Sequence, residues 1–167
     1  KVTVNKLVPQ SVQGDRRFLV ALDEMGCTVT YGKDTVTVER TGDLRGITFD
    51  MSTSPDTVQT LCMVATKATT PTTITGISHL KFKESDRING TAERLIALGG
   101  DVSVGDDSLT IRPAPLHGGT IDPENDHRTA MSFAVLGLAV GGIEITGAEC
   151  VNKSFPGFWD AVKGLIP

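Results

Sequence analysis

The hydrophobic and polar positions of this chain follow two periods, one typical of helices and one typical of strands. Apolar residues recur at helical spacing in segments 18–25 and 88–95, and charged residues occupy the opposite face of each segment. Two other runs, 57–66 and 129–142, contain no charged residue, which is typical of helices that are buried on every side. We therefore expect two kinds of helix, one covering a sheet and one enclosed in the core.

Alternating apolar and polar residues follow the amphipathic helices and predict β-hairpins. LDEMGCTVTYGKDTVTVER (22–40) and LIALGGDVSVGDDSLTIRP (95–113) each end a helix at Gly and continue with a strand, a turn and a second strand. A second similarity matches Asp56 with Asp126, at an offset of 70 residues. The sequence therefore contains an internal repeat, which we interpret as a β-α-β-α-β-β unit.

The repeat predicts one complete unit between two incomplete units. The complete unit spans residues 41–113, whereas residues 1–40 keep the end of a first unit and residues 114–167 the start of a third. The elements expected in the complete unit are a strand near 47–51, a helix from about 56, a strand near 72–77, a helix over 86–98, and hairpin strands at 101–104 and 108–112. We expect a mixed α/β (α+β) fold with a pseudo-threefold repeat, in a single partial domain from a longer protein.

Composition excludes several function classes. The 167 residues are 39% hydrophobic and 22% charged, which is typical of one globular domain. The net charge of -4 argues against nucleic acid or a membrane surface as a partner, and the longest apolar stretch, FAVLGLAVGGI, is too short to span a bilayer. Cys27, Cys62 and Cys150 lack metal-binding spacing, so we expect buried free thiols in a reducing compartment and no metal site.

Charged residues gather in front of the predicted helices. Helix N-termini attract anions, and a Lys or Arg side chain nearby strengthens that attraction. If the repeat turns equivalent helix ends to one side, these residues meet and form a site for a small polyanion whose chemistry requires proton transfer. The candidate cations are Lys83, Arg87, Arg128 and Lys153, and the candidate acid–base groups are Asp56, Glu84 and His127.

The same residues have structural interpretations. Asp56, which follows Ser-Pro, could cap a helix, and His127 could be a buried structural histidine. Lys83 and Arg87 could belong to a solvated helix start, although like charges at this spacing repel and favour a shared anionic partner. Asp86 is interpreted as a helix cap or as the partner of an arginine, with no catalytic role.

Five motifs carry a resemblance to a known family. SVQGDRRFLVALDEMG, SPDTVQT, LKFKESDRI, NDHRTAMSF and NKSFPGFW follow one another along the chain. In this order they closely resemble the C-terminal part of the 5-enolpyruvylshikimate-3-phosphate (EPSP) synthases, over essentially the whole chain. The resemblance implies an inside-out α/β barrel domain of three repeat units, with substrates bound in a cleft between two such domains. It also implies that the closing hairpin of the last unit comes from the far N-terminus of the longer chain.

The activity implied is transfer of the enolpyruvyl group of phosphoenolpyruvate to the 5-hydroxyl of shikimate 3-phosphate, with release of phosphate. This reaction belongs to chorismate and aromatic amino-acid synthesis in the cytoplasm. It needs no metal or organic cofactor, and the family is the target of glyphosate. The implied partners are the two substrates and a missing N-terminal domain that carries the remaining substrate-binding cations. We therefore expect the isolated chain to be inactive or nearly so.

Residue roles follow from the resemblance alone. Arg87, Arg128 and Lys153 bind phosphoenolpyruvate, Asp56 serves the attacking hydroxyl, and Glu84 protonates the methylene carbon with His127 beside it. Lys83, Asp56 and His79 contact shikimate 3-phosphate, although many family members have Asn at the position of His79. The alternatives are the sister transferase that acts on UDP-N-acetylglucosamine and a non-catalytic domain of the same fold.

Overall fold

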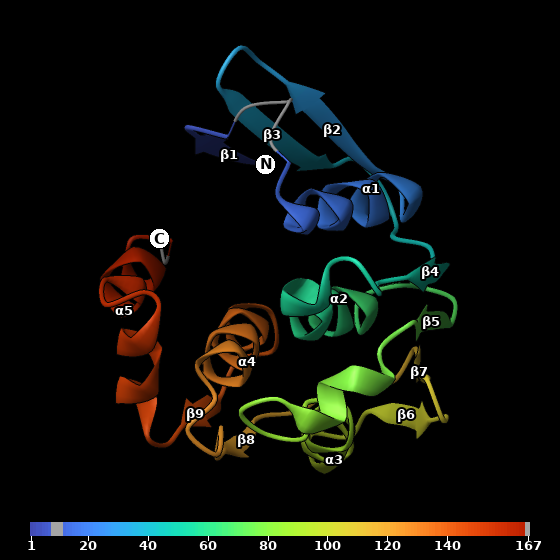
Figure 1. Cartoon of the computed structure of the whole chain (residues 1–167), viewed down its shortest axis with the longest axis vertical. Coiled ribbons are helices and arrows are strands. Elements are labelled where there is room, and N and C mark those ends of the chain that lie inside the picture. Colours follow the sequence, from blue (N-terminus) through green and yellow to red (C-terminus); the bar gives the residue numbers. More distant parts are fainter. Residues whose placement is uncertain (8–11, 166–167) are drawn as a thin grey trace.

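A computed structural model describes residues 1–7 and 12–165, so 8–11 in the predicted first unit and 166–167 in the predicted third unit lie outside the described residues. Helices α2 and α4 lie side by side in the middle of the molecule, and the other elements surround them (Figure 1). The helices are α1 (Arg17–Glu24), α2 (Val58–Ala65), α3 (Asn89–Ala97), α4 (His127–Val140) and α5 (Phe158–Lys163), with 3₁₀ turns η1 (Gly14–Arg16), η2 (Pro55–Thr57), η3 (Ser78–Phe82) and η4 (Ala148–Lys153). The strands are β1 (Val2–Asn5), β2 (Cys27–Tyr31), β3 (Thr35–Arg40), β4 (Thr48–Asp50), β5 (Thr72–Thr75), β6 (Asp101–Val104), β7 (Ser108–Arg112), β8 (Gly119–Ile121) and β9 (Ile143–Ile145).

Within the described residues the strands form three sheets that share one pairing pattern. The strand orders are β1-β3-β2, β4-β5-β7-β6 and β8-β9. Strands β4 and β5 are parallel, as are β8 and β9, whereas β1 and β5 each pair antiparallel with the second strand of a hairpin. Each sheet is therefore all or part of a parallel pair joined to an antiparallel hairpin. The sequence predicted the hairpins, and the structure adds the parallel pairing. The boundaries of the three units stay a prediction.

The core lies where α2, α3 and α4 meet the four-stranded sheet. Leu61 on α2, Ile74 on β5, Leu95 on α3, Leu109 on β7 and Phe133 on α4 are all buried in one cluster. These residues confirm that the apolar face of α3 covers the sheet and that α2 is enclosed. Burial of such side chains is worth about 1.5–3 kcal/mol each, and this packing holds the starts of α2 and α4 together.

Helix α4 is less buried than its uncharged sequence predicts. Val135 and Leu138 on this helix are each 44% exposed, so the prediction of burial on every side is wrong for the part of the chain that is described. One apolar groove, of about 210 Å³, lies between α2 and α4 near the end of β3. Another, of about 590 Å³, lies between α4, β9 and α5. Exposed apolar surface of this kind favours a covering partner.

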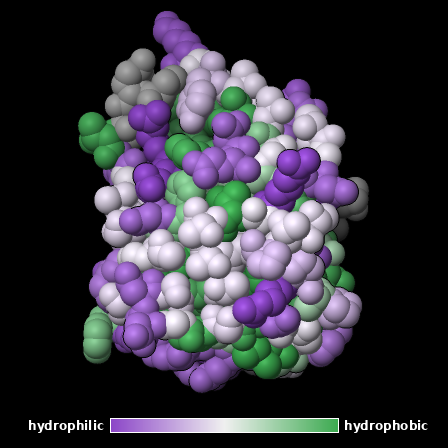
Figure 2. All heavy atoms as spheres, turned by 90° about the vertical axis from the view of Figure 1, so that its right-hand side faces the viewer, coloured by the Kyte–Doolittle hydropathy of each residue, from purple (hydrophilic) through white to green (hydrophobic). Residues whose placement is uncertain are grey.

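The side of the molecule that carries the hairpin β6–β7 has a more mixed surface than the apolar grooves beside α4. Hydrophobic side chains there form small separate groups among hydrophilic and intermediate ones (Figure 2). The two apolar grooves lie instead on either side of α4. None of the described helices is long and apolar enough to cross a bilayer.

The segment that carries KESDR is not helical. The sequence predicts a helix from Asp86, but α3 begins at Asn89. The Asp86 carboxylate explains the difference, because Oδ1 accepts hydrogen bonds from the backbone N–H groups of Ile88 (3.1 Å) and Asn89 (3.0 Å). Asp86 therefore satisfies N–H groups at the start of α3, as predicted for a cap. The residues before Asp86 are not helical, and among them Glu84 and Ser85 bond to Arg87 and Asp126.

Candidate functional site

Arg87 lies at the centre of a connected group of charged side chains. Its side chain is 1% exposed, so the interpretation of a solvated helix start is wrong. Its Nε donates to Asp126 Oδ2 at 2.7 Å, and its Nη2 donates to Glu84 Oε2 at 2.7 Å. Its Nη1 lies 3.5 Å from Asp56 Oδ1. The group, hereafter the charged cluster, consists of Asp56, Glu84, Arg87, Asp126, Arg128 and Lys153.

Asp126 joins Arg87 to the start of α4. The residue is fully buried, and its Oδ1 accepts the backbone N–H of Arg128 at 2.9 Å, which caps the helix. Ser85 Oγ donates to the other carboxylate oxygen at 3.0 Å. Burial by itself would raise the pKa of Asp126, but the hydrogen bond and charge of Arg87, with the hydrogen bonds from Arg128 N–H and Ser85, together hold the pKa below its usual value. Sequence reasoning gave Asp126 no role, although its match with Asp56 in the repeat was a usable signal.

Asp56 connects the starts of α2 and α4. Arg128 donates from Nη2 to Asp56 Oδ2 at 2.7 Å and from Nη1 to the Asp56 carbonyl at 3.1 Å. The Asp56 side chain makes no capping bond to the turn η2, in which it lies, so the helix-cap interpretation is wrong. Behind this pair, buried Gln59 donates to Thr129 Oγ1 at 2.6 Å and keeps the two helices in register.

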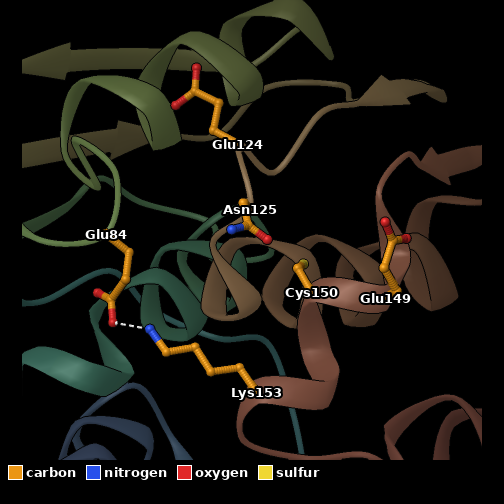
Figure 3. A pocket seen from close by; sticks show the side chains of 6 residues that line it. All are labelled: Glu84, Glu124, Asn125, Glu149, Cys150 and Lys153. Atoms are coloured by element: carbon orange, nitrogen blue, oxygen red, sulfur yellow. Dashed lines mark hydrogen bonds and ion pairs between the residues drawn. The ribbon is translucent and has the colours of Figure 1, made fainter.

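Glu84 connects Arg87 to Lys153, which comes from a distant part of the chain. Lys153 Nζ donates to Glu84 Oε1 at 2.9 Å (Figure 3). The hydrogen bond from Lys153, with further contributions from backbone N–H groups and the charge of Arg87, lowers the pKa of Glu84 to about 2. Lys153 is the last residue of η4, and α5 begins only at Phe158, so the expectation that Lys153 lies just before or at a helix start is wrong.

A cavity of about 400 Å³ adjoins the cluster. Its lining is shown in Figure 3 and comprises Glu84, Glu124, Asn125, Glu149, Cys150 and Lys153. The lining contains three carboxylates and only one ammonium group, so the cavity by itself is a poor site for a polyanion. Within residues 1–7 and 12–165, no group of three or more His, Cys, Asp or Glu side chains is arranged to hold a metal ion.

The remaining predicted residues lie beside the cluster or apart from it. Lys83 and His79 are exposed, and no hydrogen bond or ion pair joins either of them to the described part of the chain. His127 is buried, and its Nδ1 has no hydrogen-bond partner among the described residues. Burial, followed by the charge of Arg128, lowers the pKa of His127, so the ring is neutral at neutral pH.

The charges of the cluster cancel, because three cations face three carboxylates. Arg128 and Lys153 are 29% and 57% exposed, so both can reach a ligand, whereas Arg87 is enclosed by its partners. An incoming anion must therefore displace one of the carboxylates from its cation, or be bound by additional cations from outside the cluster. The arrangement suits binding of a small anion coupled to proton transfer by the displaced carboxylates.

The low pKa of Glu84 predicts a stability change in acid. A carboxyl group whose pKa is depressed on folding stabilises the fold above its unfolded pKa, 4.5 here, and that contribution is lost as pH falls towards about 2. We expect the free energy of unfolding of the unsubstituted chain to fall over this range by more than that of Glu84→Gln. Urea unfolding at pH 7, 4 and 3 measures both. An equal fall in the two proteins would contradict the assignment.

Solved structures share this architecture. EPSP synthase from Acinetobacter baumannii matches 98% of this chain with a TM-score of 0.84 at 29% identity, and this chain covers 41% of that structure. The enolpyruvyl transferase NikO from Streptomyces tendae matches 98% of this chain with a TM-score of 0.79 at 24% identity, over 38% of its own length, which shows a shared fold. The pairing pattern of the sheets and these matches define an α/β repeat protein of the enolpyruvyl transferase class.

Sequence comparison identifies the family within this class to which the chain belongs. The profile of the family described as EPSP synthase (3-phosphoshikimate 1-carboxyvinyltransferase) matches residues 1–162, and the chain belongs to this family. The 3-phosphoshikimate 1-carboxyvinyltransferase of Methanoregula boonei is 71% identical over 166 residues, and that of Methanoculleus marisnigri is 65% identical over 164 residues. The chain spans 39% of the length of each of these relatives. The family and fold expected from the sequence are therefore confirmed.

Proposed function

We propose that this chain is the portion of a 3-phosphoshikimate 1-carboxyvinyltransferase that binds phosphoenolpyruvate and supplies the proton-transfer groups. The observation that carries the proposal is that two shared carboxylates gather the three cations. Asp56 contacts Arg87 and Arg128, and Glu84 contacts Arg87 and Lys153. The names of the relatives support shikimate 3-phosphate, rather than UDP-N-acetylglucosamine, as the acceptor.

Phosphoenolpyruvate carries a carboxylate and a phosphate, so it requires several fixed cations. Arg128 offers a planar pair of donors for either group, and Lys153 adds a mobile positive charge. Arg87 is buried and bonded to carboxylates, so it contacts the substrate after Asp56 or Glu84 has moved aside. The substrate then takes the place that these carboxylates occupy in the cluster.

The reaction requires one proton to leave the acceptor and one to reach the donor. The 5-hydroxyl oxygen bonds to C2 of phosphoenolpyruvate, its proton passes to Asp56, and C3 gains a proton from Glu84. In the second step the C2–O bond to phosphate breaks, the departing phosphate takes the proton held by Asp56, and C3 returns a proton to Glu84, which yields the enol ether and inorganic phosphate and restores both carboxyl groups. Both carboxylates belong to the cluster, so the proton-transfer groups and the anion-binding groups are in contact.

Glu84 must be protonated before it can act as the acid. With a pKa of about 2 it is ionised at neutral pH, because Lys153 and Arg87 stabilise its charge. A substrate anion that takes Lys153 removes the largest of these effects, so the pKa of Glu84 rises on binding. Substrate binding thereby prepares the acid, and neutral His127 lies close to the same group of charges.

The second substrate and the rest of the protein complete the site in this proposal. Exposed Lys83 and His79 are available to shikimate 3-phosphate, together with Asp56. An N-terminal domain supplies the remaining cations and covers the apolar grooves beside α4, and the closing hairpin pairs with the free edge of β9. Cys62 and Cys150 are buried free thiols, whereas Cys27, at the start of β2, is partly exposed, so the prediction of burial is wrong for Cys27. Three free thiols suit a reducing cytoplasm.

A chimaera tests the proposal. In it, these 167 residues replace the matching segment of the Methanoregula boonei relative. We expect the chimaera to release phosphate from phosphoenolpyruvate in the presence of shikimate 3-phosphate, and the isolated chain to be slower by roughly 10³-fold or more, because half of the positioning contacts are missing.

Phosphate release is measured with each protein at equal concentration, after circular dichroism has shown that both are folded. UDP-N-acetylglucosamine is the control acceptor. Comparable turnover by the isolated chain would contradict the proposed division of the site, and turnover of the control acceptor in place of shikimate 3-phosphate would contradict the substrate.

A further inference from the structure

Arg94 lies outside the charged cluster but contacts the turn that leads into it. The residue is on α3, and its side chain is 12% exposed. Its Nε donates to the carbonyl of Asp122 at 2.6 Å, and its Nη2 lies 3.3 Å from Glu124 Oε1. In Figure 3 the Glu124 side chain points away from Glu84 and Lys153. Arg94 thus fastens the segment after β8 to α3 at two points.

The fastened turn has an unfavourable backbone conformation. Glu124 and Asn125 have φ angles of 52° and 60°, in the left-handed region that residues with a Cβ atom seldom adopt. Such a conformation persists where surrounding bonds enforce it. The bonds here are those of Arg94 and two within the turn, from Glu124 N to Asp122 Oδ1 (2.8 Å) and from Asp126 N to the Pro123 carbonyl (2.9 Å).

The turn determines where Asp126 lies, because Asp126 is the next residue along the chain. Asp126 in turn holds Arg87 through its carboxylate and caps α4 through the N–H of Arg128. A relaxation of Glu124 or Asn125 towards an ordinary φ would rotate the peptide that carries Asp126. The geometry points to Arg94 as a positioning residue, which acts through the 122–125 turn to keep Asp126 aligned with Arg87.

Gly90 offers a way to disturb Arg94 without removing it. Arg94 folds back over Gly90 on the same helix, and a Cβ atom at position 90 would collide with Arg94 Nη1. Gly90→Ala therefore displaces the guanidinium group. The same change favours the helix, because Ala has a higher helix propensity than Gly. Loss of Arg94 function in a well-folded Gly90→Ala protein would separate positioning from a general loss of stability.

Hydrogen exchange of the Arg87 side chain tests the inference in the 167-residue chain. The Nε–H of Arg87 is buried and bonded to Asp126, so its NMR signal should exchange slowly with water. We expect exchange at least tenfold faster in Arg94→Met and at least threefold faster in Gly90→Ala, with unchanged exchange of the buried Leu61 amide. Arg112→Met is the matched control, because Arg112 also pairs with a carboxylate, at 3.3 Å, but on the exposed hairpin.

Unchanged Arg87 exchange in folded Gly90→Ala and Arg94→Met would overturn the inference. If Arg94→Met does not fold, the same Arg87 exchange measurement is made on Gly90→Ala and Glu124→Gln, and unchanged exchange in both would overturn the inference. A second measurement rests on the proposed function: in the chimaera, Gly90→Ala should raise the KM for phosphoenolpyruvate about tenfold and leave kcat within about twofold. An inactive unsubstituted chimaera would count against the proposed function, while faster Arg87 exchange would still support the role of Arg94.

Discussion

Replacement of Arg128 by alanine should lower kcat/KM of the chimaera by about 10³-fold, because truncating one partner of a charge pair at a binding site costs about 2–5 kcal/mol. The Arg128 guanidinium carries both contacts to Asp56 that link α2 and α4, and it is exposed enough to meet a ligand. Its loss removes a cation for phosphoenolpyruvate and leaves the Asp56 carboxylate without its closest partner. The rate is measured by phosphate release at saturating shikimate 3-phosphate.

Two further substitutions serve as controls for Arg128→Ala. Arg128→Lys keeps the charge but loses the planar pair of donors, so it should recover a part of the activity. Arg112→Ala removes an exposed arginine far from the cluster and should change kcat/KM by less than twofold, as expected for a surface ion pair. A loss of less than tenfold in Arg128→Ala would favour the alternative of a non-catalytic domain.

Replacement of Asp126 by alanine should destabilise the isolated chain by about 3–5 kcal/mol, because it leaves a buried guanidinium without its principal partner. Asp126 is fully buried and accepts hydrogen bonds from the side chains of Arg87 and Ser85 and from the backbone of Arg128. Loss of the α4 cap adds about 1 kcal/mol. Such a sum is a large share of the stability of a domain of this size. Urea unfolding followed by circular dichroism measures the change.

A double-mutant cycle identifies the cause of the loss. Removal of both charges in Asp126→Ala with Arg87→Met should be less destabilising than the sum of the two single changes, because no unpaired buried charge remains. Asp101→Ala is the matched control, since Asp101 forms an exposed pair with Arg112 on the hairpin, and its effect should stay within about 0.5 kcal/mol. Additive effects of Asp126→Ala and Arg87→Met would contradict direct coupling between them.

Much of the fold was predictable because its signals are local. The periodicity of apolar residues depends on the geometry of a single helix or strand, so the amphipathic helices and both hairpins were found at nearly their observed bounds. The 70-residue offset between Asp56 and Asp126 likewise needs no coordinates. The start of α3 was placed three residues early, because the side chain of Asp86 bonds to the backbone after it and delays the helix.

The candidate site was predictable as a set of residues and unpredictable as a network. Helix starts and charge indicated Arg87, Arg128 and Lys153 as cations, and the structure brings them together through shared carboxylates. The burial of Arg87 was missed, because a charged side chain reads as exposed unless its partners are known. Asp126 was assigned no role for the same reason, since its partner Arg87 lies 39 residues earlier in the chain.

The sequence by itself determined the repeat, the amphipathic helices with the hairpins that follow them, and the family. Tertiary structure alone decided which charges are paired, which are buried, and which face the cavity beside Glu84 and Lys153. The physical reason is the separation along the chain over which each effect acts. Helix and strand periodicity arises between residues a few positions apart, whereas the free energy of a charge depends on its partners and on its burial, which packing of distant segments sets.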